Sequence, residues 1–277
     1  MLHHSQSHCG HCDLVFSNPM ADAKELAKYY ANEYYEESSL PVDDKDLEAK
    51  TRTRADGEVE GLKDLILPHV KSGRFFEIGA GYGNLLDAAR RLGFEVAGVE
   101  PSKGAVDFAH KVMKIPELKC GMFEPNDWPE NFCDVVYAFH VVEHVPDLME
   151  FMNEIQRILR PGGVMYLGTE NHRNAHVAWR RIVNAVRGRF LPEFQTADHH
   201  TFYFSDLSLE YAAKKAGMEV IKTLVYTGTP GETLAEKLKR YKFRHPFSKM
   251  LFLAQYYWDT LPGRGNRVLI WARKPAK

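Results

Sequence analysis

The chain lacks the features that mark several large classes of protein. No apolar run approaches 18 residues, so the sequence predicts no membrane-spanning helix. Its 36 basic and 37 acidic residues give a net charge of −1, which creates no overall field that would favour nucleic acid. Residues 1–8 are polar and rich in histidine, unlike a signal peptide. These absences predict a cytoplasmic protein with no nucleic-acid partner.

Cysteine is also scarce, with only four residues in the chain. Cys120 and Cys133 lie in apolar, strand-like contexts, and we expect both to be reduced core residues. Cys9 and Cys12 form a Cys-x-x-Cys pair, but two thiolates cannot complete a tetrahedral zinc site. The neighbouring side chains that could complete one are His3, His4, His8 and His11. We predict that no metal is bound.

Segments typical of strands alternate with segments typical of helices from residue 74 onward. The predicted strands are 74–78, 94–99, 118–120, 133–139 and 164–168, and the predicted helices between them are 84–92, 102–113 and 147–159. This alternation predicts a parallel, doubly wound α/β sheet. Beyond it, the pattern predicts helices at 175–187, 205–216, 232–243 and 247–260, and strands at 218–226 and 267–273.

A glycine-rich turn follows the first of these strands. Gly79, Gly81 and Gly83 are preceded by Glu77, and Glu100 ends the next strand. Glycines let the backbone approach a ligand closely, and a carboxylate at the second position can hold a ribose diol. Glu77 would repel the pyrophosphate of a nicotinamide dinucleotide, and the glycine spacing differs from Gly-x-Gly-x-x-Gly. The pattern therefore favours S-adenosyl-L-methionine, which carries an ammonium and a sulfonium and no phosphate.

Four motifs in order resemble one known family. They read FFEIGAGYGNLL, VAGVEPS, FCDVVYAFHVVEHVPD and ILRPGGVMYLGTE, and they lie within residues 74–170. This core resembles the class I S-adenosylmethionine-dependent methyltransferases, and is most similar to the small-molecule branch that includes the ubiquinone-biosynthesis O-methyltransferases. The resemblance implies a Rossmann-like, seven-stranded, mostly parallel sheet with helices on both faces. Its last strand, antiparallel in the family, maps onto residues 267–273.

The resemblance also implies a domain organisation. Residues 1–20 look like the remnant of a cysteine knuckle, residues 21–70 like an N-terminal helical lid, and residues 71–277 like the methyltransferase domain. Tyr34 and Tyr35 would belong to the lid or form an ordinary packed aromatic pair. Two segments, about 171–204 and about 228–263, exceed the length that connections need, so we expect them to contribute to acceptor recognition and the second to form C-terminal helical insertions.

Cofactor contacts carry over residue by residue from the family motifs. Glu77 and Gly79 would hold the methionine amino end, and Glu100 would accept both ribose hydroxyls. Met122 stands where the family often has an aspartate. The complete predicted set is Glu77, Gly79, Ala80, Gly81, Gly83, Glu100, Pro101, Ser102, Met122, Phe123, Phe139 and His140.

Histidines supply the candidate general bases. Proton removal from a hydroxyl acceptor benefits from a base that titrates near neutrality. The candidates are His140, at the end of the predicted strand 133–139, and His199 and His200, before the next aromatic segment. A histidine pair that fixes a loop is the alternative for His199 and His200, and His144 is more typical of a loop-organising residue.

The predicted function is transfer of a methyl group from S-adenosylmethionine to a small-molecule acceptor, most simply at an oxygen. The alternatives are a nicotinamide-dependent oxidoreductase and a non-catalytic, methyltransferase-like binding protein. The region 232–260 is basic and then aromatic, which fits either a solvated face or a surface for a lipid-linked or anionic acceptor and peripheral membrane contact. The sequence leaves the oligomeric state open.

Overall fold

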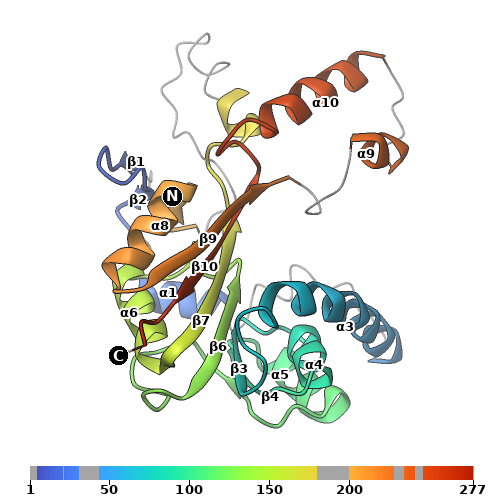
Figure 1. Ribbon diagram of the computed structural model, residues 1–277, viewed down its shortest axis with the longest axis vertical. Coiled ribbons are helices and arrows are strands. Elements are labelled where there is room, and N and C mark those ends of the chain that lie inside the picture. Colours follow the sequence, from blue (N-terminus) through green and yellow to red (C-terminus); the bar gives the residue numbers. More distant parts are fainter. Residues whose placement is uncertain are drawn as a thin grey trace.

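A seven-stranded sheet forms the body of the protein in the computed structural model (Figure 1). The structure describes residues 5–20, 22–30, 44–179, 200–227, 234–240 and 246–276. The strand order is β5-β4-β3-β6-β7-β10-β9. The bounds are β3 (Arg74–Ile78), β4 (Glu95–Glu100), β5 (Leu118–Cys120), β6 (Cys133–Phe139), β7 (Leu159–Glu170), β9 (Glu219–Tyr226) and β10 (Arg267–Arg273).

The strands from β5 to β7 pair in parallel, and β10 runs antiparallel to both β7 and β9. The predicted Rossmann-like sheet with one reversed strand at 267–273 is therefore confirmed. The central strands are buried on both faces because helices cover both sides of the sheet. Such a sheet brings the carboxyl ends of its parallel strands to one edge, where ligands bind in open α/β folds.

Helices cover the two faces in the layers that Figure 1 shows. On one side lie α3 (Asp44–Ile66), α4 (Asn84–Arg91) and α5 (Lys103–Phe108), which continues as the π-helical turn η2 (Ala109–Met113). On the other lie α1 (Ala23–Lys28), α6 (Leu148–Ile158) and α8 (Asp206–Lys215). Two apolar clusters, one on each face, pack these helices onto the sheet.

Capping residues explain where the helices begin and end. Ser102 caps α5 by accepting a hydrogen bond from the Ala105 amide at 3.3 Å, and Asp147 caps α6 by accepting from the amides of Met149 and Glu150. Gly93, with φ 92°, follows the end of α4. The predicted cap at Ser102 and the predicted helix end at Gly93 are both confirmed.

A second, three-stranded sheet was not predicted from the sequence. It consists of β1 (Ser5–His8), β2 (Val15–Asn18) and β8 (Phe202–Tyr203), all antiparallel. Cys9 and Cys12 lie in the turn between β1 and β2. The N-terminal hairpin thus pairs with a strand about 190 residues later in the chain, and the proposed domain division at residues 20 and 70 stays a prediction.

Three local predictions need correction. Cys120 is exposed, because β5 is an edge strand in which Leu118 alone is buried, whereas Cys133 is buried as expected. The helix predicted at 147–159 is α6, which ends at Ile158, and β7 begins at Leu159 rather than at the predicted Val164. The predicted helix 102–113 divides into α5 and η2.

The helices α9 (Leu234–Arg240) and α10 (Pro246–Asp259) precede β10, and α10 lies beyond the sheet edge in Figure 1. Trp258 Nε1 donates to the Arg173 carbonyl at 3.4 Å, which joins α10 to the segment after β7. Among the residues that the structure describes, no helix combines the length and the apolar composition needed to cross a membrane.

Candidate active site

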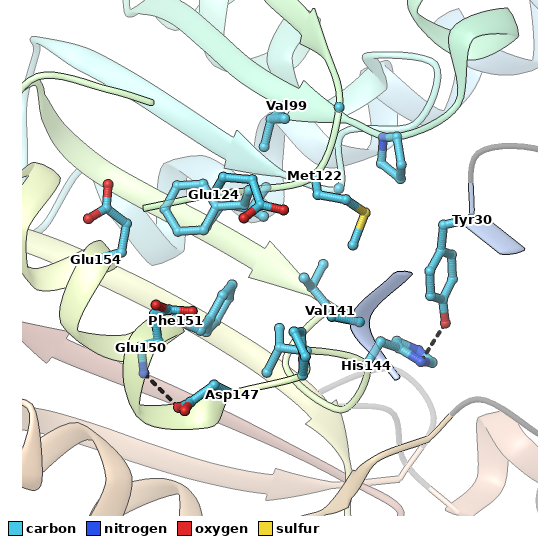
Figure 2. A pocket seen from close by; sticks show the side chains of 18 of the residues that line it. Tyr30, Val99, Met122, Glu124, Val141, His144, Asp147, Glu150, Phe151 and Glu154 are labelled. Carbon is cyan, nitrogen blue, oxygen red and sulfur yellow. Dashed lines mark hydrogen bonds between the residues drawn. The ribbon is translucent and has the colours of Figure 1, made fainter. Parts of the chain in front are cut away.

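A cavity of about 230 Å³ opens at the carboxyl ends of the central strands (Figure 2). Ile78 at the end of β3, Glu100 at the end of β4 and Phe139 at the end of β6 all line it. The chain leaves β3 toward β4 on one side, whereas β6 pairs with β3 on the other. The cavity therefore lies at the topological switch point of the sheet.

The glycine turn after β3 requires glycine for two separate reasons. Gly79, Gly81 and Gly83 have φ values of 75°, 53° and 82°, a region that side chains disfavour. A Cβ atom on Gly79 would also lie 2.7 Å from Cγ2 of Val141. The turn thus packs its backbone closely against Val141, and its close approach to a ligand stays a prediction.

Glu100 anchors this turn from the neighbouring strand. Its Oε2 accepts a hydrogen bond from the Gly81 amide at 2.8 Å, and its Oε1 accepts one from the Ser102 amide at 2.9 Å. Glu100 is 3% exposed, and this burial raises its pKa even though the two amides act to lower it. Each carboxylate oxygen keeps a further lone pair for a ligand.

Glu77 is a buried carboxyl group beside the same turn. Within the described part of the chain, its Oε2 atom is buried and has no hydrogen-bond partner. Burial raises the pKa of Glu77 well above the ordinary value, and the charges of Glu58 and Glu100 add to the rise. A buried carboxylate of this kind is costly unless a positive group pairs with it.

The predicted cofactor residues divide into two groups. Those that line the cavity are Gly79, Glu100, Pro101, Met122, Phe123, Phe139 and His140. Those that lie outside its lining are Glu77, Ala80, Gly81, Gly83 and Ser102. Gly81 and Ser102 nevertheless act on the cavity, since their amides hold Glu100.

His140 lines the cavity and pairs with Glu143, which lies outside the lining. Glu143 Oε1 lies 2.9 Å from His140 Nδ1. Burial alone would raise the pKa of Glu143, but the His140 hydrogen bond and the charges of His144 and His140 hold it below the ordinary value. His140 has φ 56°, and its amide donates to the Gly168 carbonyl at 2.9 Å. A non-glycine residue held in this region is often part of a functional site.

Several cavity residues were missed by sequence reasoning. Tyr30, just after α1, donates to or accepts from His144 Nδ1 at 2.6 Å, and both residues line one end of the cavity. In the view of Figure 2, Glu150 and Glu154 of α6 lie at the other end. Tyr30 lies close in sequence to Tyr34 and Tyr35, which we expected either in a lid or in an ordinary packed pair. The contact of Tyr30 with His144 spans more than 100 residues and leaves no sequence signal.

The other predicted residues have different outcomes. His199, Tyr34 and Tyr35 lie outside the described residues. His200 does not line the first cavity but lines a second one, described below. Its ring meets that of His144 edge-on, with centroids 4.6 Å apart. The structure therefore brings His140, Glu143, His144 and His200 together.

Three of these residues could in principle hold a metal ion. Glu143, His144 and His200 each bring one ligand atom within 4.8 Å of the others, and this is the one such group found among the described residues. Glu143 Oε1 is bonded to His140, and His144 Nδ1 to Tyr30. Cys9 and Cys12 belong to no such group in the described part of the chain.

The chain is similar in sequence to curated methyltransferases. A ubiquinone biosynthesis O-methyltransferase of Bradyrhizobium sp. (strain ORS 278) is 35% identical over 149 residues, which are 48% of this chain and 56% of the relative. The chain thus spans about half the length of the curated relatives that it matches. Those relatives include a similar enzyme of Rhodopseudomonas palustris (strain BisB18), 36% identical over 128 residues, 43% of this chain and 48% of the relative.

Solved structures share the fold at lower identity. An S-adenosylmethionine-dependent methyltransferase from Mesorhizobium loti matches with a TM-score of 0.55 at 17% identity, over 79% of this chain and 99% of that one. A geranyl diphosphate C-methyltransferase from Streptomyces coelicolor A3(2) matches with a TM-score of 0.54 at 17% identity, over 91% and 97%. Residues 51–223 match a family model described as a methyltransferase domain, so the chain belongs to the methyltransferase-domain family.

Proposed function

We propose that the chain transfers a methyl group from S-adenosyl-L-methionine to an oxygen atom of a small-molecule acceptor. The observation that carries the proposal is the contact between Glu143 and His140, because His140 lines the cavity at the carboxyl ends of the strands. The family, and the O-methyltransferase names of the similar proteins, support it.

The residues around the glycine turn fit this cofactor. Glu77 offers a buried carboxylate oxygen without a partner among the described residues, which suits the methionine ammonium. Glu100, at the end of β4, offers two oxygens to a ribose diol. Met122 and Phe123 provide apolar surface for the adenine, and Glu124 on the same loop offers an acceptor for its amino group.

The tautomer of His140 follows from Glu143. Because Glu143 has a lowered pKa, it is ionised near neutral pH and can only accept hydrogen bonds. The proton between the two residues must then lie on His140 Nδ1, which leaves a lone pair on Nε2. His140 can therefore take the acceptor hydroxyl proton at Nε2, and Glu143 stabilises the imidazolium that forms.

When bound, S-adenosylmethionine supplies a methyl carbon that bonds to the acceptor oxygen as its bond to sulfur breaks and the sulfur keeps the electron pair. The protein contributes alignment and exclusion of water. The apolar side chains of Phe139, Val141 and Phe151 line the cavity and exclude water from it.

The alternatives are less well supported. A nicotinamide dinucleotide would bring a pyrophosphate to the turn beside Glu77, where burial of two negative groups is unfavourable. A non-catalytic binding protein would have no need of the His140–Glu143 pair. Both remain as outcomes of the test that follows.

Calorimetry and a turnover assay test the proposal. Isothermal titration with S-adenosylmethionine should give binding, and titration with NAD should give none. Binding of NAD alone would overturn the choice of cofactor. An acceptor screen that follows release of S-adenosylhomocysteine should give turnover that His140→Gln abolishes. Binding without any turnover would favour the non-catalytic alternative.

Two further parts of the proposal concern partners. The proposed reaction uses no metal ion, and native mass spectrometry that found one divalent ion per chain would contradict this.

The basic and aromatic residues of α9 and α10 fit an anionic or lipid-linked acceptor, with Lys239, Lys249, Met250 and Tyr257 all exposed. Co-sedimentation with anionic liposomes at low salt tests membrane contact, and absence of binding would exclude it.

A further inference from the structure

A second cavity, of about 340 Å³, lies beyond the first on the same edge of the sheet. It is bounded by the end of β7 and the loop after it, by β8, by the start of β10 and by one residue of α10. Its lining includes Glu143, Thr169, His200, Asn266 and Arg267. In contrast to the first cavity, most of its lining side chains are polar or charged.

Three buried polar atoms of residues that line this cavity lack partners. Glu143 Oε2, Thr169 Oγ1 and Asn266 Oδ1 have no hydrogen-bond partner within the part of the chain that the structure describes. Glu143 is 2% exposed and Thr169 is 1% exposed. Buried polar groups in folded proteins are nearly always hydrogen-bonded. Three such atoms on the lining residues of one cavity therefore favour a polar ligand, which rotation of these side chains would let them reach.

The chemistry of these atoms defines that ligand. Glu143 Oε2 and Asn266 Oδ1 accept hydrogen bonds, and the Thr169 hydroxyl can donate or accept. A guanidinium, Arg267, also lines the cavity and disfavours a simple cation. Hydroxyl groups both donate and accept, so neighbouring hydroxyls can satisfy all of these residues together. A long apolar chain would leave the same atoms unpaired, so it would gain no hydrogen bond from this cavity.

The two cavities are linked by three contacts. Glu143 connects the two cavities. It lines the second cavity, and its Oε1 lies within hydrogen-bond distance of His140, which lines the first. The rings of His144 and His200 meet across the boundary. The third contact joins Arg267 of the second cavity to Phe139 of the first. Arg267 Cζ lies 5.7 Å from the centre of the Phe139 ring.

We propose that the second cavity is the acceptor site and that the acceptor is a small molecule with several neighbouring hydroxyl groups, a sugar or a cyclic polyol. This inference rests on the proposed methyl transfer, because the first cavity then holds the donor. It separates this chain from enzymes that methylate an acceptor with a long apolar tail. A hydroxyl held near Glu143 would lie on the His140 side of the cavity.

The test compares two kinds of acceptor with one donor. The polar probes are a panel of hexoses, nucleotide-linked hexoses and myo-inositol, and the apolar probe is a catechol with a geranyl chain. Release of S-adenosylhomocysteine reports turnover, and saturation-transfer NMR reports binding of each probe. We expect turnover with at least one polyhydroxylated probe and none with the geranyl catechol. Turnover with the geranyl catechol alone would overturn the inference.

A matched pair of variants links the result to the second cavity. Thr169→Val removes one hydroxyl without a change of shape and should raise the KM for the polar acceptor by about tenfold, the effect of one lost hydrogen bond. The affinity for S-adenosylmethionine should not change. Thr53→Val, on the exposed face of α3, is the control and should change neither quantity.

The outcomes distinguish this inference from the proposed function. Binding of S-adenosylmethionine without binding or turnover of any polyhydroxylated probe would overturn the acceptor class while leaving the donor assignment intact. Failure of S-adenosylmethionine to bind would overturn the proposed function, and probe binding that Thr169→Val weakens would then still support a polyol site. An equal effect of Thr169→Val and Thr53→Val would contradict the placement of the site.

Discussion

Glu143 Oε1 lies 2.9 Å from Nδ1 of His140, and the two residues belong to a loop that follows β6. The separation of three residues along the chain lets one carboxylate fix the imidazole that lines the first cavity. Since Glu143 is ionised near neutral pH, it also fixes which ring nitrogen carries the proton. This pair has a direct kinetic consequence.

Glu143→Gln should lower kcat by about a hundredfold, at the lower end of what general-base catalysis contributes. A glutamine amide can donate to Nδ1 and so favours the wrong tautomer, and it gives less stabilisation to the imidazolium. The measurement is steady-state release of S-adenosylhomocysteine, with cofactor affinity followed by calorimetry. Glu130→Gln, at an exposed site, is the control. Equal kcat values for Glu143→Gln and the control would exclude Glu143 from the proton transfer.

Glu77→Gln should have opposite effects on stability and on cofactor binding. Because burial raises the pKa of Glu77, its negative charge destabilises the ligand-free fold. This destabilisation is complete above the raised pKa of the folded state and vanishes below the ordinary value of 4.5. The ligand-free variant should therefore melt at a higher temperature than the parent at pH 8, with the difference smaller at low pH.

The same variant should bind S-adenosylmethionine about tenfold to a hundredfold more weakly, because a charged hydrogen bond to the ammonium is lost. Thermal melts and calorimetry on one preparation give both quantities. A variant that binds as tightly as the parent would remove Glu77 from the cofactor site. A lower melting temperature would mean that Glu77 is paired in the ligand-free protein.

The glycine turn and the sheet were the parts that the sequence predicted well. Each depends on local information: Gly79, Gly81 and Gly83 occupy backbone conformations that side chains disfavour, and the apolar runs have the lengths of buried strands. The antiparallel strand at 267–273 required the family resemblance in addition. In the glycine turn and the sheet, the local sequence pattern and the tertiary structure favour the same conformation.

The second cavity and the small sheet were beyond prediction because their parts are distant in sequence. Val15 pairs with Tyr203, and the second cavity brings Glu143 near Asn266. Cys120 was wrongly assigned to the core, since one sequence does not say which strand lies at the edge of a sheet. The sequence also did not predict the hydrogen bond between Glu143 and His140, because this contact depends on the conformation of the loop after β6.

Glu100→Ala should weaken cofactor binding by about 1–3 kcal/mol, the range for an unpaired buried polar group. The structure adds a second expectation. Loss of the carboxylate leaves the amides of Gly81 and Ser102 without their acceptor, so the ligand-free protein should also be less stable. Calorimetry and urea unfolding measure the two effects.

Glu95→Ala provides the matched control on the same strand. Glu95 is exposed at the opposite end of β4 and pairs with Arg74 at the surface, at 2.8 Å. Surface ion pairs contribute little, so this variant should keep both cofactor affinity and most of the stability. Unchanged affinity in Glu100→Ala would mean that the ribose is held elsewhere.

Asp13→Asn should destabilise the protein in a manner that depends on pH. Asp13 lies in the hairpin turn, with Arg173 Nε 2.8 Å and His172 Nε2 3.3 Å from its Oδ2. Burial acts to raise its pKa, but hydrogen bonds from Ser205 and His8 and the charges of its other partners lower the pKa to about 2. Asparagine tolerates the φ of 62° at this position, so the change removes mainly the charge.

The sign follows from the lowered pKa. A carboxylate with a lowered pKa contributes stability that is complete above its ordinary value of 3.8 and is lost as the pH falls toward about 2. The difference corresponds to about 2 kcal/mol in the free energy of unfolding. Urea unfolding at pH 7 should show this gap between parent and variant, and at pH 2.5 the gap should be much smaller. Asp127→Asn, at an exposed site, controls for general charge effects. A gap that stays constant with pH would show that shape, and not the charge of Asp13, attaches the hairpin to the segment after β7.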